Sequence, residues 1–266
     1  MDLESTRALR NLNLDFYEKA AESFSRTRRA PWAGWYRAWA AVAPTGTTPR
    51  VLDLGCGNGR FLGFLDQAAG PRLGQSWDYV GLDSSSGLLE QARLRSFHYG
   101  QVHWVNGDLL ETPLDERVSR RPFDAILLLA VLHHIPGAER RMRLVRESAS
   151  RLSLGGCLVV SLWRFAESER GRKAVRSWSD VNESAGLEID PSRLEVGDHA
   201  LGWGPVPGSY RYCHHFSELE VRQLAEGSGL ELIDEYRADG ESDEANHYLV
   251  LRRSPWHRIR AGLGGD

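Results

Sequence analysis

A strand that runs into a glycine-rich loop is the feature that most restricts how this chain can fold. Residues 51–60 read VLDLGCGNGR, so an apolar run ends at Gly55, and Gly57 and Gly59 follow at alternate positions. Glycine adopts positive φ without strain and lets a ligand approach the backbone closely. The spacing is GxGxG, whereas a dinucleotide-binding loop has GxGxxG. The loop therefore predicts either a ligand cradle of another kind or a tight turn between a strand and a helix.

Strands and helices alternate through most of the remaining chain. Short apolar runs predict five strands, at Arg50–Leu54, Tyr79–Leu82, Val102–Val105, Phe123–Ala130 and, after a turn at Gly155-Gly156, Cys157–Leu162. The stretches between them predict helices at Arg60–Ala69, Gly87–Ser96 and Ala138–Leu152. This order indicates a doubly wound α/β fold, in which crossover helices cover a parallel sheet. A further helix is predicted at Ser217–Ser228, followed by two closing strands at Leu230–Tyr236 and His247–Leu251.

The limits of this alternation divide the chain into segments. Residues 1–44 read as helical, with Trp, Tyr and Arg interleaved, and we expect them to form a lid or a substrate-binding segment. The main domain is predicted to span residues 45–253, beginning in a Pro- and Gly-rich loop. Residues 163–216 interrupt the pattern as a polar insertion on the substrate side, and residues 254–266 read as a frayed tail.

Carboxylates follow three of the predicted strands. Asp53 lies two residues before Gly55, Asp83 ends the second strand, and Asp108 follows the third. Parallel strands bring such residues to one edge of the sheet, where open α/β sheets bind ligands. Asp83 is therefore placed to accept hydrogen bonds from both hydroxyls of a ribose. Asp108 can accept from the amino group of an adenine, or it can simply cap its own loop.

With these elements in this order, the chain resembles the Rossmann-like class I S-adenosylmethionine (SAM)-dependent methyltransferases. The resemblance covers about residues 45–253 and includes the two closing strands, which correspond to the antiparallel hairpin at the edge of that family's sheet. It implies SAM as the cofactor, whose cationic amino acid end a carboxylate such as Asp53 can position. The residues that the resemblance assigns to the cofactor are Asp53, Gly55, Gly57, Asp83, Ser84, Asp108, Leu109 and Ala130.

A more specific likeness lies partly outside this common core. The segments that carry it are FY at residues 16–17 with FSRTRRAPW at 24–32, AVLHH at 130–134, RYCHHF at 211–216 and NHYLV at 246–250. They resemble the tRNA wobble-uridine carboxymethyl methyltransferases, which esterify a carboxylate on a modified uridine. The resemblance implies tRNA as a partner, and Arg28, His133 and Arg211 as residues that position the acceptor. In eukaryotes that family often works with a small zinc-binding activator subunit. Residues 198–203 read DHALGW and depart from the family's D-x-L-V-P-W.

Ester formation fits these residue types. A carboxylate is already ionised near neutral pH, so methyl transfer to it needs alignment rather than a strong general base. Arginine can bind a carboxylate or a phosphate in a bidentate fork, and interleaved Arg and Trp suit RNA. The same tryptophans can instead pack a lid helix on the sheet. Two other functions stay open: a methyltransferase of small molecules, in which LHHI loops are also common, and a SAM-binding protein without activity.

The RYCHHF segment also raises the question of a metal site. Adjacent histidines in an extended chain point to opposite faces, so His214 and His215 are poorly placed to share an ion. Alternation puts Arg211, Cys213 and His215 on one face and Tyr212, His214 and Phe216 on the other. We therefore expect no metal, and we expect Arg211 to contact the acceptor, with Tyr212 and His214 as second candidates.

Composition restricts location and partners. The formal net charge is −3, so no overall positive field draws the chain to nucleic acid. Cys56, Cys157 and Cys213 are widely spaced, and reduced thiols are expected. The start of the chain lacks the apolar centre of a signal peptide, and no apolar run approaches the roughly 18 residues of a membrane span. We expect a cytoplasmic protein without a membrane contact.

Overall fold

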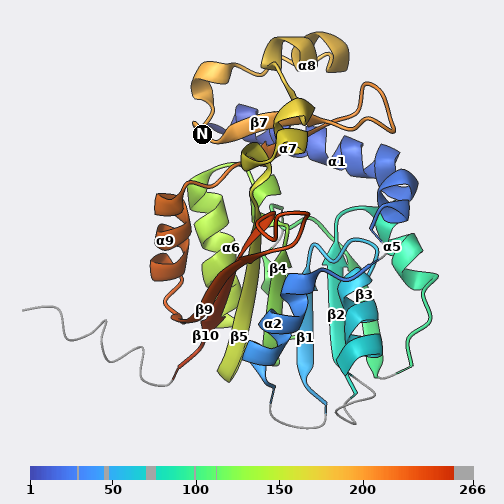
Figure 1. Cartoon of the computed structure of the whole chain (residues 1–266), viewed down its shortest axis with the longest axis vertical. Helices are drawn as coiled ribbons and strands as arrows, with labels where there is room; N and C mark the ends of the chain where they lie inside the picture. Colours follow the sequence, from blue (N-terminus) through green and yellow to red (C-terminus); the bar gives the residue numbers. More distant parts are fainter. Residues whose placement is uncertain (29, 45–47, 70–75, 99, 112, 255–266) are drawn as a thin grey trace, which may run out of the picture.

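A mostly parallel β-sheet forms the centre of the molecule (Figure 1). The computed structural model describes the chain apart from residues 29, 45–47, 70–75, 99, 112 and 255–266. In this part the sheet has seven strands in the order β3 (Gln101–Asn106), β2 (Asp78–Asp83), β1 (Arg50–Leu54), β4 (Phe123–Leu129), β5 (Leu152–Trp163), β10 (Asn246–Arg252) and β9 (Glu231–Ala238). The first five run parallel, and β10 is antiparallel to both β5 and β9. The predicted parallel sheet with an antiparallel closing hairpin is confirmed.

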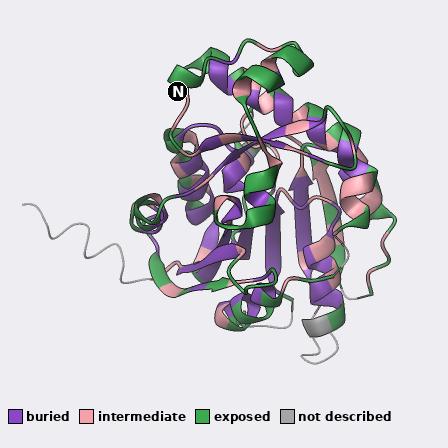
Figure 2. Cartoon of the chain, turned by 45° about the horizontal axis from the view of Figure 1, so that its top comes forward, coloured by how far each residue is buried: buried purple, intermediate pink, exposed green. Residues whose placement is uncertain are grey.

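Helices cover both faces of this sheet and bury its strands (Figure 2). α2 (Ala33–Val42) and α3 (Arg60–Phe64) pack on one face, and α6 (Ala138–Ser150) and α9 (Glu218–Gly227) pack on the other. α5 (Ser86–Arg93) lies along β2 and β3. Because both faces are covered, the central strands read as continuous apolar runs. Among the described residues, every helix is too short or too polar to traverse a lipid bilayer.

A second layer covers the edge at which the parallel strands end (Figure 1). It consists of α1 (Leu3–Arg26) and residues 163–216, and we call it the cap. Besides α7 (Glu169–Ala174) and α8 (Trp178–Ala185), residues 163–216 contain an antiparallel sheet of β6 (Val175–Arg176), β7 (Asp198–Gly202) and β8 (Tyr210–His214). α1 packs against β8 and α5, so the cap rests directly on the main domain.

The cap is more regular than the sequence predicts. The insertion at 163–216 carries its own sheet, and the Gly- and Pro-rich stretch at 202–208 is the connection between β7 and β8. Strands of five residues leave too few alternations for a clear signal. They become stable through contacts with a distant segment, because Ala200 and Tyr212 are buried against Leu9 and Leu12 of α1.

Other sequence predictions need smaller corrections. The predicted turn at Gly155-Gly156 is wrong, because β5 already begins at Leu152. The register between β4 and β5 shifts there and Gly155 has a φ of +82°, so these glycines form an irregularity within the strand. The helix predicted at Arg60–Ala69 is α3 followed by a π-helical turn, Leu65–Ala69. Residues 45–47 of the predicted loop and residues 255–266 of the predicted tail lie outside the described residues.

A buried carboxylate on β7 ties the cap to the helices below it. Asp198 Oδ1 lies 2.7 Å from both Tyr212 Oη and His214 Nδ1, which donate to it, and Asp198 Oδ2 accepts from the Glu195 backbone N–H at 2.9 Å. The other nitrogen of His214, Nε2, lies 2.9 Å from Glu220 Oε1 in the first turn of α9. Two strands of the cap are thus joined to α9 through a single imidazole.

We predict that Asp198→Ala lowers the free energy of unfolding by about 3 kcal/mol, because it leaves three buried donors without their acceptor. Urea denaturation followed by tryptophan fluorescence measures this loss. Asp180→Ala, at an exposed position of α8, is the matched control and should change stability by less than about 0.5 kcal/mol. Equal losses in the two variants would contradict the role of Asp198.

Candidate functional site

A cavity of about 1130 Å³ lies between the cap and the carboxyl ends of the parallel strands. It forms where strand order reverses, because β1 has β2 on one side and β4 on the other. The residues assigned to the cofactor and the first candidates for the acceptor all line this one cavity: Arg28, Asp53, Gly55, Gly57, Asp83, Ser84, Asp108, Leu109, Ala130, His133 and Arg211. Segments far apart in the chain are therefore brought together as the spacing predicted.

The glycine loop is held open by its backbone conformation. Gly55, Gly57 and Gly59 have φ values of +73°, +54° and +71°, in the left-handed region that favours glycine. A Cβ on Gly55 would lie 2.5 Å from Val131 Cγ2, so a larger residue does not fit there. The Gly57 N–H donates to Asp83 Oδ2 at 2.8 Å, which fixes the loop to the end of β2.

Three carboxylates line the floor of the cavity in different environments. Asp53 is buried and accepts a hydrogen bond from Tyr79 Oη at 2.5 Å; burial raises the pKa of its carboxyl to about 7. Burial also raises the pKa of Asp83, although the N–H groups of Ser85 and Gly57 donate to its two oxygens. Asp108 pairs with Arg10 at 2.5 Å and caps its own loop through the Leu110 N–H.

Two histidines after β4 have different surroundings. His134 Nδ1 lies 3.0 Å from the Tyr212 carbonyl, which can only accept, so this nitrogen carries the proton. His134 Nε2 then accepts from Tyr17 Oη at 2.7 Å. Burial, together with the charge of Arg211, lowers the pKa of His134 to about 3. His133 is also buried with a depressed pKa, but its Nδ1 has no hydrogen-bond partner among the described residues.

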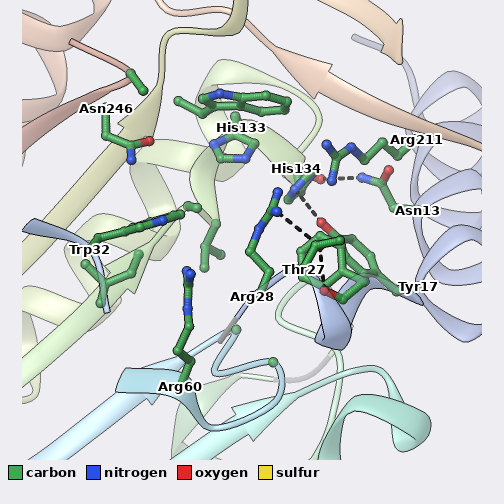
Figure 3. Close-up of a pocket in the computed structure, with 18 of the residues that line it drawn as sticks. Asn13, Tyr17, Thr27, Arg28, Trp32, Arg60, His133, His134, Arg211 and Asn246 are labelled. Carbon is green, nitrogen blue, oxygen red and sulfur yellow. Dashed lines mark hydrogen bonds between the residues drawn. The ribbon is translucent and has the colours of Figure 1, made fainter. Parts of the chain in front are cut away.

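Arginines line the side of the cavity that faces the glycine loop (Figure 3). The guanidinium of Arg211 is buried and lies 5.0 to 5.7 Å from the ring centroids of Phe16, Trp163 and Trp203. Arg28 comes from the turn after α1, and burial with the nearby charge of Arg211 lowers its pKa. The arrangement is a desolvated, positively charged surface that faces the glycine loop across the cavity.

The side chains of β8 alternate between two faces as predicted. Arg211 faces the cavity, whereas Tyr212 and His214 both turn toward Asp198. The prediction that Tyr212 and His214 are second acceptor candidates is wrong, because neither lines the cavity and both hold the cap together. Their polar atoms already have partners in that network.

Two groups of side chains each bring three atoms that could bind a metal within 4.8 Å of one another. The first group is His133, His134 and Cys213, and the second is Glu195, Asp198 and His214. In the first group both nitrogens of His134 are hydrogen-bonded, and burial raises the pKa of the Cys213 thiol to about 12, whereas a metal requires the thiolate. The second group is occupied by the cap network. Neither group therefore offers three free ligand atoms to a metal.

His134, which the resemblance places beside His133 in the AVLHH segment, lines the cavity as well, whereas some other cavity residues were not assigned a role: Asn13, Tyr17, Trp32, Arg60 and Asn246. Tyr17, Trp32 and Asn246 lie within or beside the segments that carried the specific resemblance, so a signal existed for them. Arg60 directly follows the glycine loop as the first residue of α3, and no feature of the sequence marked its side chain as part of the site. Its guanidinium lies 4.4 Å from the Trp32 ring centroid, and burial with the charge of Arg28 lowers its pKa to about 10.

We predict that His134 stays neutral, with its proton on Nδ1, from about pH 8 down to about pH 5. Nitrogen NMR of the imidazole measures both the tautomer and any titration. The unfolded chain takes up a proton near pH 6.5 that folded His134 does not, so this residue makes the free energy of unfolding fall as pH drops below that value. A His134 signal that titrates above pH 5 would overturn the assignment.

Known proteins are similar to this chain in sequence, and others are similar to it in fold. A family model described as a methyltransferase domain matches residues 52–158. A protein of Encephalitozoon cuniculi that carries a provisional methyltransferase name is 30% identical over 238 residues, covering 90% of this chain and 93% of its own. The tRNA (carboxymethyluridine(34)-5-O)-methyltransferase ALKBH8 of Macaca fascicularis is 30% identical over 256 residues, covering 96% of this chain; the chain spans 35% of its length.

Solved structures agree at the level of the fold. A crystal structure of a SAM-dependent methyltransferase from Methanosarcina mazei superimposes with a TM-score of 0.56 at 15% identity, covering 84% of this chain and 98% of that one. The sheet order, the glycine loop at its switch point and the shared sequence agree with one another. The chain belongs to the class I SAM-dependent methyltransferases.

Proposed function

We propose that this methyltransferase esterifies the carboxylate of a 5-carboxymethyl-type uridine at the wobble position of tRNA. The observation that carries the proposal is a set of three arginines, Arg28, Arg60 and Arg211, which line one cavity (Figure 3). In the described part of the chain none of them forms an ion pair with a carboxylate. Desolvated cations without a counter-charge are unfavourable, so anionic ligands are expected to compensate for them.

The glycine-loop side of the cavity fits the cofactor. A Cβ on Gly57 would meet only Leu88 Cδ1, at 4.0 Å, so the loop presents open backbone to a ligand. Each oxygen of Asp83 has one backbone donor and keeps a second lone pair for a ribose hydroxyl. Asp53 is placed for the ammonium of the amino acid end, while Ser84, Leu109 and Ala130 complete the lining. SAM supplies an electrophilic methyl group to the acceptor oxygen.

The cap side fits an anionic acceptor. One arginine suffices for the carboxylate at the amino acid end of the cofactor, which leaves cations for the acceptor's carboxylate and for phosphates. Arg211 is rigid because three aromatic rings surround it, and a preorganised fork can align a carboxylate oxygen with the methyl carbon. His133 Nδ1, buried and without a partner among the described residues, can add a hydrogen bond.

The relatives support tRNA as the class of acceptor. Enzymes named as tRNA (carboxymethyluridine(34)-5-O)-methyltransferases, from Macaca fascicularis among other species, align with this chain at about 30% identity. Because the chain spans only a third to a half of those two proteins, their substrate comes to it as part of this proposal. A requirement for a small activator subunit stays a prediction.

We predict that cofactor affinity weakens as pH falls below about 7. The raised pKa of Asp53, about 7, means that its carboxyl takes up a proton there and no longer attracts the ammonium group. S-adenosylhomocysteine carries the same amino acid end, and calorimetry should show about tenfold weaker binding per pH unit below 7. Asp53→Asn removes the titrating group and should flatten this dependence; an unchanged slope in the variant would refute the role of Asp53.

We predict that Arg28→Ala lowers kcat/KM for a carboxymethyluridine RNA by about 10- to 100-fold while S-adenosylhomocysteine still binds within about twofold. The substrate is an anticodon stem–loop with 5-carboxymethyluridine at the wobble position, and mass spectrometry of its nucleosides detects the methyl ester. Arg26→Ala, two residues earlier and exposed, is the matched control and should retain activity. If the purified protein with SAM forms no methyl ester on this RNA, the proposed function is wrong.

A further inference from the structure

Asn246, the first residue of β10, has a buried acceptor atom without a partner. Its side chain lines the cavity, the residue is 3% exposed, and its Oδ1 accepts no hydrogen bond from any described residue. Figure 3 shows the amide turned toward the cavity on the side of His133, above Trp32. An unpaired buried carbonyl oxygen is unfavourable, so a donor on a ligand is the expected complement.

The orientation of this amide is determined by Asp239. The carboxylate of Asp239 is buried and receives three donors: Asn246 Nδ2 at 2.8 Å, Tyr248 Oη at 2.6 Å and the Gly34 N–H at 2.9 Å. With donors on both of its oxygens, this carboxylate acts here only as an acceptor. Asn246 must therefore offer its nitrogen to Asp239, which leaves the oxygen, and not the nitrogen, facing the cavity.

We propose that Asn246 Oδ1 accepts a hydrogen bond from the imino N–H at position 3 of the acceptor base, so that Asn246 selects uracil over cytosine. This inference rests on the proposed function and adds the residue that reads the base. Uracil presents a donor at N3, whereas cytosine presents an acceptor there, which would face Asn246 Oδ1 without a proton between them.

The rest of the cavity supports this assignment of roles. Arg28, Arg60 and Arg211 supply only donors, which suit the carboxylate and carbonyl oxygens of the acceptor. Asn246 instead directs an unpaired acceptor oxygen at the cavity. Trp32, which lines the same cavity and lies below Asn246 in the view of Figure 3, is an aromatic ring on which a flipped-out base can stack. A base that stacks there needs one donor toward β10, and uracil has it.

The test compares two RNAs with two enzymes. The RNAs are anticodon stem–loops that carry 5-carboxymethyluridine or 5-carboxymethylcytidine at the wobble position, and kcat/KM for methyl transfer is measured on each. The wild-type protein should prefer the uridine RNA by on the order of 100-fold, since a mismatched acceptor leaves a buried group unpaired. Asn246→Ala should reduce this preference at least tenfold, mainly by losing activity on the uridine RNA.

A second variant keeps the side chain of Asn246. Asp239→Asn removes the carboxylate that holds the amide in one orientation, so the preference for uridine should again fall although Asn246 is intact. Asn182→Ala is the control: this asparagine of α8 bonds the backbone of Ile189 through both ends of its amide and does not line the cavity. It should lower stability and leave the preference unchanged.

The outcomes separate the two proposals. If the wild-type protein methylates both RNAs equally well, or if Asn246→Ala and Asp239→Asn keep the wild-type preference while methylating the uridine RNA, the role of Asn246 is refuted and the proposed function stands. If the wild-type protein methylates neither RNA, the proposed function fails and the inference falls with it. A preference that declines in both variants but not in Asn182→Ala supports the inference.

Discussion

The hydrogen bonds of one imidazole join the parts on which this site depends. His134 lies in the 3-10 turn that follows β4, accepts from Tyr17 of α1, and donates to the carbonyl of Tyr212 on β8. A single neutral ring therefore connects the sheet, the N-terminal helix and the inserted strands. Asn13 reinforces the same junction, since its amide accepts from the Tyr212 N–H and donates to the His134 carbonyl. This junction, together with the network around Asp198, holds the cap over the carboxyl ends of the sheet.

The sheet and the cap line the enclosed cavity with different chemical groups. The sheet contributes glycines with positive φ and buried carboxylates, which suit a cofactor with a ribose and a cationic end. The other side contributes Arg211 from β8 of the cap and Arg28 from the turn after α1. Their charges act in a region of low dielectric constant and are correspondingly strong. The glycine-loop side thus carries Asp53 and Asp83, and the cap side carries Arg211. An alignment-dependent methyl transfer between two bound molecules requires such a divided cavity.

Much of the sheet half could be predicted from the sequence. Gly57 and Asp83 are separated by a strand and a helix, yet they meet through a 2.8 Å hydrogen bond because parallel strands end at one edge. The cap half of the site was harder to predict from the sequence. Arg211, Tyr212 and His214 are polar residues within four positions of one another. Only the position of Asp198 on the neighbouring strand shows that Tyr212 and His214 bind it, whereas Arg211 faces the cavity. Alternation separated the faces but could not say which one was the site.

The order of strands and helices in the main domain, the glycine loop and the edge at which ligands bind could all be read from the sequence, since they follow from periodicity and local spacing. Only the tertiary structure decided which polar groups are satisfied. Asn246 lies in a segment that carries the specific resemblance, but the sequence does not reveal how its amide is oriented. Asp239, which also binds the Gly34 N–H from 205 residues away, fixes that amide with the oxygen toward the cavity. Hydrogen-bond partners that come from distant segments leave no local pattern, and they decide what a cavity can recognise.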